Sequence, residues 1–106
     1  MKPEHPLNFL FTLNEQGEPV RASSVVEWGK WYEDFAHRQL AKDQVEDRLI
    51  STVFLGIATN WGGKPLLFET MVFDQDGKPV EQQRYATRDE ALRGHRDVVS
   101  RLRKTH

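Results

Sequence analysis

The sequence predicts an α+β fold with elements in the order β-α-β-β-β-α, and three features support that prediction. Capping boxes at 24–27 (Ser-Val-Val-Glu) and 87–90 (Thr-Arg-Asp-Glu) mark the starts of two helices. Apolar runs at 48–58 and 66–73 flank a glycine-containing insert, as in two paired strands. Apolar residues alternate along 7–13, as in a half-buried strand. We therefore expect an antiparallel sheet of about four strands with both helices packed on it.

Composition bounds the class of protein. A chain of 106 residues, with 38% apolar and 29% charged residues, suits one globular domain spanning 1–106. The net charge of −1 argues against a protein that binds mainly DNA phosphates. The chain has no cysteine, which excludes disulfides and thiolate metal sites. No segment resembles a signal peptide or a membrane span, so we expect a cytoplasmic protein without membrane contact.

The first half is predicted from its periodicities. Leu7, Phe9, Phe11 and Leu13 share one face of the first strand, and Gly17 lies in the turn that follows. From Ser24 we expect a helix of about 16 residues, followed by a polar connection at 41–47. Within that helix Trp31 points away from the main apolar stripe, which predicts self-association, as a dimer.

The second half is predicted to form the centre of the sheet. The run 48–58 is apolar on both faces, as in a central strand, and 66–73 is its antiparallel neighbour. A turn at 74–79 leads to a polar edge strand at 80–86 and then to the last helix. We expect a core that includes these side chains: Val53, Leu55, Phe68 and Val72.

Two turns have nearly the same sequence, NEQGEPV and DQDGKPV. We interpret the likeness as shared turn chemistry, because glycine and proline recur in such turns for local reasons. Duplication of a strand–turn–helix unit is the alternative. The segment Asp74-Gln75-Asp76-Gly77 is also interpreted as a turn, because it lacks the later glutamate of a calcium loop.

The insert between the two long strands is the first candidate binding site. Its glycines do not lead into a helix, since Pro65 and a strand follow, so it is not a phosphate loop. A hairpin turn is one interpretation, and an aromatic recognition tip is the other. The tip would consist of Asn60, Trp61, Gly62, Gly63 and Lys64.

A second candidate is a pocket formed by Glu69, Tyr85 and His95. Glu69 lies mid-strand among apolar neighbours, so it is either an inward salt bridge with Arg84 or Arg48 or a general acid or base. His95 lies on the apolar stripe of the last helix, which favours a hydrogen-bonded core histidine over a catalytic one. The four histidines show no metal-ligand spacing, and we predict no metal and no cofactor.

Several strings resemble a family of small uncharacterised proteins common in phages and prophages. They are GEPV, WGKWYED, STVFLGI, a Trp-Gly-Gly insert, PLLFETMVF and RYATRDEALRGH, and together they cover roughly residues 10–96. The resemblance implies a phage setting, and with it the cytoplasm of a bacterial host cell, but no particular chemistry. In many members that resemble this chain, an acidic residue and a histidine precede the aromatic residue of the insert. In this sequence Ala58, Thr59 and Asn60 occupy those positions, which weakens the hypothesis of an enzyme.

Three functions follow as hypotheses. The first is a non-enzymatic phage accessory protein that binds a host or phage protein, for example to blunt a bacterial defence. The second is a small enzyme or small-molecule-binding domain that uses Glu69, Tyr85 and His95. The third, which the charge balance disfavours, is nucleic-acid binding by the basic last helix through Arg93, Arg96, Arg101, Arg103 and Lys104.

Overall fold

The computed structural model describes residues 9–58 and 63–104. Its elements are β1 (Phe11–Leu13), β2 (Pro19–Arg21), α1 (Val25–Glu33), α2 (Phe35–Arg38), β3 (Gln39–Val45), β4 (Arg48–Phe54), β5 (Phe68–Phe73), β6 (Pro79–Tyr85) and α3 (Arg88–Lys104). The α+β class is confirmed. The predicted order lacked β2, β3 and α2.

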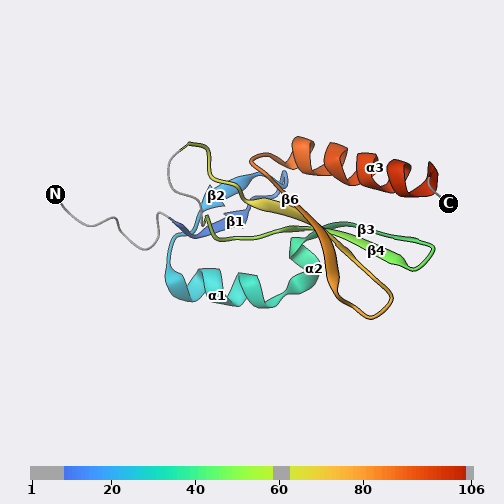
Figure 1. Ribbon diagram of the computed structural model, residues 1–106. Coiled ribbons are helices and arrows are strands. Elements are labelled where there is room, and N and C mark those ends of the chain that lie inside the picture. Colours follow the sequence, from blue (N-terminus) through green and yellow to red (C-terminus); the bar gives the residue numbers. More distant parts are fainter. Residues whose placement is uncertain (1–8, 59–62, 105–106) are drawn as a thin grey trace.

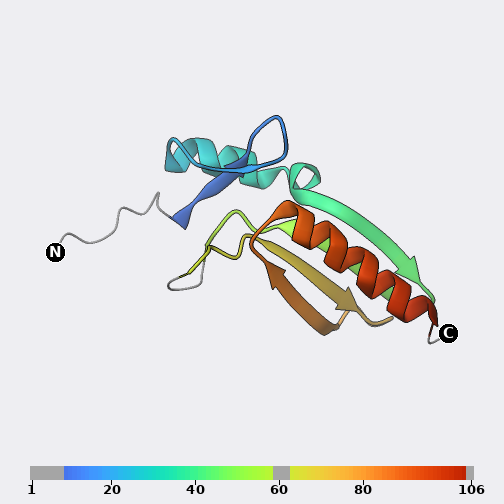
Figure 2. The same cartoon turned by 90° about the horizontal axis from the view of Figure 1, so that it is seen from above.

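The molecule is elongated, with extents of 52 × 27 × 27 Å. We call residues 9–38 the N-terminal lobe; it holds the hairpin of β1 and β2 with α1 and α2 (Figure 1). We call residues 39–104 the sheet lobe; it holds the antiparallel sheet β3-β4-β5-β6 with α3 lying along one face (Figures 1 and 2).

The predicted four-stranded sheet is confirmed, but one of its strands was assigned wrongly. The strand predicted at 7–13 is shorter and pairs with β2 in a separate two-stranded sheet. Its place in the main sheet is taken by β3, in the segment predicted to be a polar connection. An edge strand tolerates the charged and amide side chains of this segment because one of its edges and one of its faces meet water.

The predicted long first helix is broken at Asp34. Its backbone is extended there, with φ −85° and ψ 91°, and its carboxylate accepts a hydrogen bond from Ala36 N at 3.1 Å. Asp34 thus ends α1 and caps α2, because a short carboxylate competes well for free N–H groups at a helix start. Both predicted helix starts are confirmed: Ser24 Oγ accepts from Glu27 N at 3.0 Å, and Thr87 and Glu90 bond reciprocally.

Of the helices that the structure describes, only α3 lies over the four-stranded sheet (Figure 1), contrary to the prediction that both long helices do. The α3 side of the sheet carries the fully buried side chains Ile50, Thr52, Phe54, Phe68, Thr70 and Val72. Phe68 and Val72 are core residues as predicted. Val53 and Leu55 are only half-buried, so their prediction was wrong; α3 packs on the face that carries Thr52, opposite to the face that carries Val53.

The two lobes share one core cluster. Phe11 of β1 packs with Phe54, Phe68 and Ala91 of the sheet lobe, and Trp31 of α1 joins them. The Trp31 ring meets Phe54 edge-on, with centroids 5.6 Å apart. Trp31 is therefore packed within the chain, and the reason given for self-association does not hold. A second cluster, Val45, Ile50, Val72, Val99 and Leu102, lies at the far end beneath α3.

Candidate functional site

Most of the predicted recognition tip lies outside the described residues: Asn60, Trp61 and Gly62 are not described. Gly63 and Lys64 are exposed. Gly63 has φ 66°, and among the described residues a Cβ there would meet no atom within 4 Å.

The three residues of the second predicted pocket do not converge. Glu69 faces away from α3, since its neighbour Thr70 points to α3 and successive strand residues alternate. Tyr85 and His95 both lie on the α3 side, but they line different hollows. The sequence indicated which strand or helix holds each of the three residues, but it did not indicate on which face of the sheet each side chain lies.

Glu69 forms the salt bridge predicted as one of its two roles. Arg84 Nε lies 3.0 Å from Glu69 Oε2, and Gln82 also donates to this carboxylate. The other candidate partner, Arg48, instead pairs with Asp47 at 3.7 Å. Glu69 is 7% exposed, so the pair keeps a buried carboxylate neutralised.

His95 is a hydrogen-bonded core histidine, as the sequence favoured. It is 3% exposed, and its Nε2 lies 2.8 Å from Asp43 Oδ2. Its Nδ1 lies 2.7 Å from Thr52 Oγ1, which in turn lies 2.5 Å from Thr70 Oγ1. A carboxylate only accepts, so His95 Nε2 donates to Asp43; with the neutral imidazole, Thr52 donates to Nδ1 and Thr70 donates to Thr52.

This chain of Asp43, His95, Thr52 and Thr70 has the residue types of a catalytic triad but not its access. A hydroxyl nucleophile has to reach substrate, whereas Thr52 and Thr70 are 0% and 2% exposed. The two hydroxyls lie between the sheet and α3, and the carboxylate of Asp43 is the part that meets solvent. The arrangement satisfies buried polar groups and ties α3 to the strands β3, β4 and β5.

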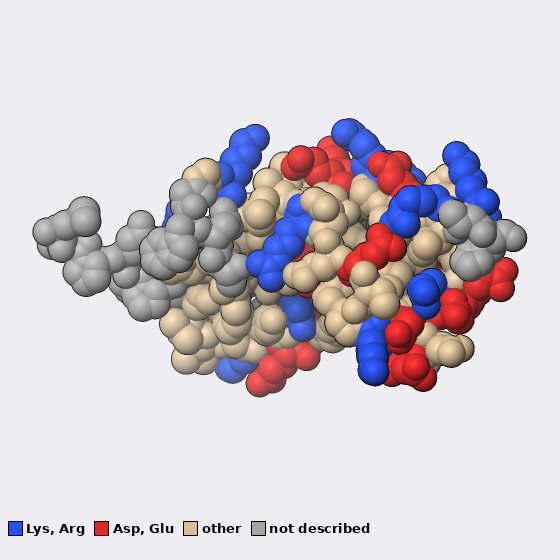
Figure 3. All heavy atoms as spheres, viewed as in Figure 1, with Lys and Arg blue, Asp and Glu red and all other residues tan. Residues whose placement is uncertain are grey.

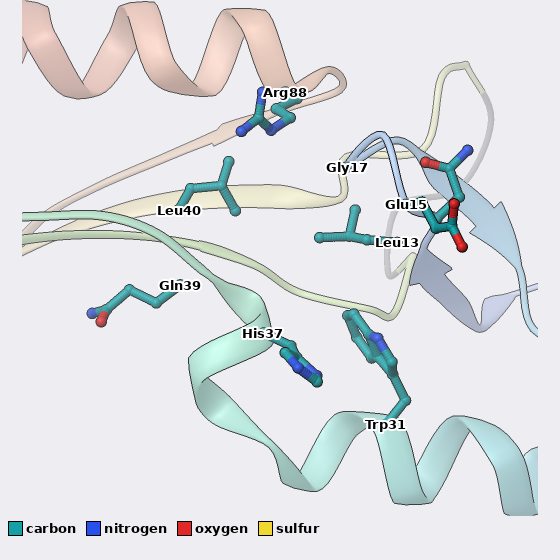
Figure 4. A pocket seen from close by; sticks show the side chains of 9 residues that line it. Leu13, Glu15, Gly17, Trp31, His37, Gln39, Leu40 and Arg88 are labelled. Atoms are coloured by element: carbon teal, nitrogen blue, oxygen red, sulfur yellow. The ribbon is translucent and has the colours of Figure 1, made fainter.

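A hollow of about 420 Å³ lies between the two lobes, and sequence reasoning did not predict it. We call it the inter-lobe hollow; Figure 4 shows its walls drawn from the β1–β2 turn, α1, α2, the start of β3 and the first residue of α3. Its lining combines apolar with polar and charged side chains: Leu13, Asn14, Glu15, Gly17, Trp31, His37, Gln39, Leu40 and Arg88. A partly apolar lining with a few convergent polar groups is typical of a binding site.

Arg88 is the distinctive group of the inter-lobe hollow. It begins α3 and lies against the β1–β2 turn, where a Cβ on Gly17 would stand 3.1 Å from Arg88 Nε. Within residues 9–58 and 63–104 its guanidinium forms no hydrogen bond and no ion pair. Gln39, by contrast, donates to Ser51, and the Asn14 side chain accepts from Gln16 and Glu18. The free guanidinium is therefore available to a bound group.

The basic side chains of α3 lie on two sides of the helix. Arg101 pairs with Glu81 of β6 at 2.5 Å. On the β3 side, a second hollow of about 500 Å³ is lined by Asp43, His95, Arg96, Val99, Ser100, Arg103 and Lys104; we call it the basic hollow. Elsewhere on the face seen in Figure 3, acidic and basic side chains are interspersed.

Two classes of site are absent from the described part of the chain. No group of three or more histidine, aspartate or glutamate side chains there could hold a metal ion. None of the described helices is both long and apolar enough to cross a membrane.

Comparisons with protein-family models, with curated proteins and with solved structures found no match to this chain.

Proposed function

We propose that this chain is a phage- or prophage-encoded accessory protein that acts as a non-enzymatic binding module on a host or phage protein, for example to blunt a bacterial defence. The phage setting rests on the family resemblance of strings such as PLLFETMVF and RYATRDEALRGH. The binding role rests on the surface of the molecule.

The inter-lobe hollow is the observation that carries the proposal. Leu13, Trp31 and Leu40 give it an apolar floor, and the guanidinium of Arg88 stands over Leu40 (Figure 4). A hollow of this size accommodates one or two partner side chains, and a buried anchor of that kind dominates many interfaces. An apolar side chain next to a carboxylate would match both the floor and Arg88.

The buried chain of Asp43, His95 and Thr52 supports the non-enzymatic form of the proposal. Its imidazole is engaged at both nitrogens, and its hydroxyls do not meet solvent. A catalytic base has to reach the proton that it removes. Glu69 and His95 lie on opposite faces of the sheet, so these two residues of the enzymatic alternative share no pocket.

The proposal includes self-association, and it rests on side chains other than Trp31. The large apolar side chains exposed at the start of α1 and of α2 are Val25 (56%), Val26 (69%) and Phe35 (49%). Val25 and Val26 are adjacent at the first turn of α1, and exposed neighbouring apolar side chains often mark an interface.

Capture of partners from phage-infected host cells tests the proposal. Tagged wild-type protein is compared with Arg88→Glu and with Arg93→Glu, which makes the same charge change at an exposed site of α3 outside the inter-lobe hollow. We expect one host or phage protein to be retained by the wild type and by Arg93→Glu, and to be lost with Arg88→Glu. Equal retention by all three proteins would contradict a partner in the inter-lobe hollow.

A further inference from the structure

The basic hollow holds three cations without partners in the described structure. Arg96, Arg103 and Lys104 recur at seven- and eight-residue steps on one side of α3, so they share a face two turns apart. No ion pair within 4.0 Å links any of them to another described residue, whereas Arg101 on the other side of the helix is paired with Glu81. Ser100 lies between them and adds a hydroxyl donor.

The charge of the basic hollow stays positive after its neighbours are considered. Its single carboxylate, Asp43, already accepts from His95 at 2.8 Å. The end of α3 carries about half a negative charge from its free carbonyl groups, which Arg103 and Lys104 offset. A net positive potential remains, and it favours an anionic ligand.

The basic hollow adjoins an unpaired strand edge. Asp43 belongs to β3, which pairs with β4 on one side and has no described strand on the other. Figure 2 shows β3 running along the flank of α3, with its outer edge turned away from the sheet. A register shift interrupts the strand between Gln39 and Ala41, so the regular part is 41–45. Its free N–H and C=O groups are a template for an added strand.

We propose that the edge of β3 and the basic hollow together bind an extended acidic segment of a partner protein. The inference rests on the proposed binding function and names the class of partner. The segment adds to β3 along 41–45 in the manner of β-augmentation, and its backbone bonds to the strand. Carboxylates on every second residue then stand on the α3 side, about 7 Å apart, within reach of Arg96, Arg103 and Lys104.

A peptide is favoured over a nucleic acid on two grounds. The whole chain has a net charge of −1, and a duplex would bring phosphates close to the acidic side chains that lie among basic ones on the face seen in Figure 3. The unpaired backbone edge recognises another peptide backbone, which a nucleic acid lacks.

The test uses the purified full chain and a fluorescent peptide of about ten residues in which glutamate and threonine alternate. Anisotropy is measured at about 0.15 M salt. We expect Arg96→Glu and Arg103→Glu each to weaken binding about tenfold or more. Arg93→Glu is the matched control, because Arg93 is exposed on the same helix and does not line the basic hollow; it should change binding less than about twofold.

A second peptide, N-methylated at alternate residues, tests the backbone pairing, and it should bind about tenfold more weakly. Equal weakening by Arg93→Glu and Arg96→Glu would show general charge attraction and overturn the proposal. Undiminished binding of the methylated peptide, or tighter binding of a single-stranded oligothymidylate of the same length, would overturn it as well. Failure here with Arg88-dependent partner capture intact would leave the proposed function standing.

Discussion

The ring of Tyr85 in β6 lies directly against Gly94 in α3. A Cβ built on Gly94 would stand 2.5 Å from both Cε1 and Cζ of that ring. Glycine is thus required in the interior of a 17-residue helix, where it otherwise weakens the helix. The contact sets how closely α3 approaches the end of β6.

Gly94→Ala should therefore destabilise the protein by about 1 to 3 kcal/mol, even though alanine favours helix. Gly29→Ala in α1 is the matched control, because a Cβ there meets no atom within 4 Å; it should stabilise by about 0.5 to 1 kcal/mol. Urea denaturation measures both. A stabilised Gly94→Ala protein would mean that Tyr85 moves aside freely.

The buried chain of hydroxyls gives a prediction about coupling. Thr52→Val removes a hydroxyl that serves both His95 and Thr70, and should cost about 1 to 3 kcal/mol. Thr52→Val with Thr70→Val should cost less than the sum of the single changes, because each single change leaves a buried partner unsatisfied. A double-mutant cycle from urea denaturation measures the difference, and strict additivity would refute the assigned chain.

Phe54 joins the two lobes through its contacts with Trp31 and Phe68. It is fully buried, so Phe54→Ala should lower the free energy of unfolding by about 3 to 5 kcal/mol. The half-buried Val53 beside it supplies the comparison, since Val53→Ala leaves a smaller cavity and should cost clearly less. Equal costs would argue against the observed burial pattern.

Local chemistry made much of the fold predictable. The two turns of nearly the same sequence are an example. Asn14 Oδ1 accepts hydrogen bonds from the backbone N–H groups of residues 16 and 18 at 2.9 Å, and Asp74 Oδ1 accepts from those of residues 76 and 78 at 2.9 Å. Gly17 and Gly77 have φ values of 78° and 80°. Shared turn chemistry accounts for the likeness, because a side-chain acceptor and a left-handed glycine close the same hairpin.

The features that could not be predicted depend on contacts between residues that lie far apart in the sequence. Asp34 ends α1 because its carboxylate caps α2, although the apolar stripe continues past it to Phe35. The strand β3 looks like a linker because it is an edge. Neither hollow leaves a local signal, since Arg88 lines one hollow with Leu13, and Arg96 lines the other with Asp43, only once the lobes and α3 are in place.

Trp61 gives a prediction that is independent of the described geometry. If the Asn60–Lys64 tip recognises a partner, Trp61→Ala should leave the melting temperature nearly unchanged and weaken partner binding by about 2 kcal/mol or more. Calorimetric melting and titration of the captured partner measure the two effects. Unfolding on substitution would instead place the Trp61 side chain in the core.

Isothermal titration well below the melting temperature measures whether a partner binds in the inter-lobe hollow. Arg88→Glu should weaken partner binding by about 2 kcal/mol or more, because it reverses the charge in that hollow. Thr52→Val and Arg93→Glu should bind within about 0.5 kcal/mol of wild type, because neither changes that hollow. Loss of binding with Thr52→Val and full binding with Arg88→Glu would contradict the account, and would place the function at the buried chain of Asp43 and His95.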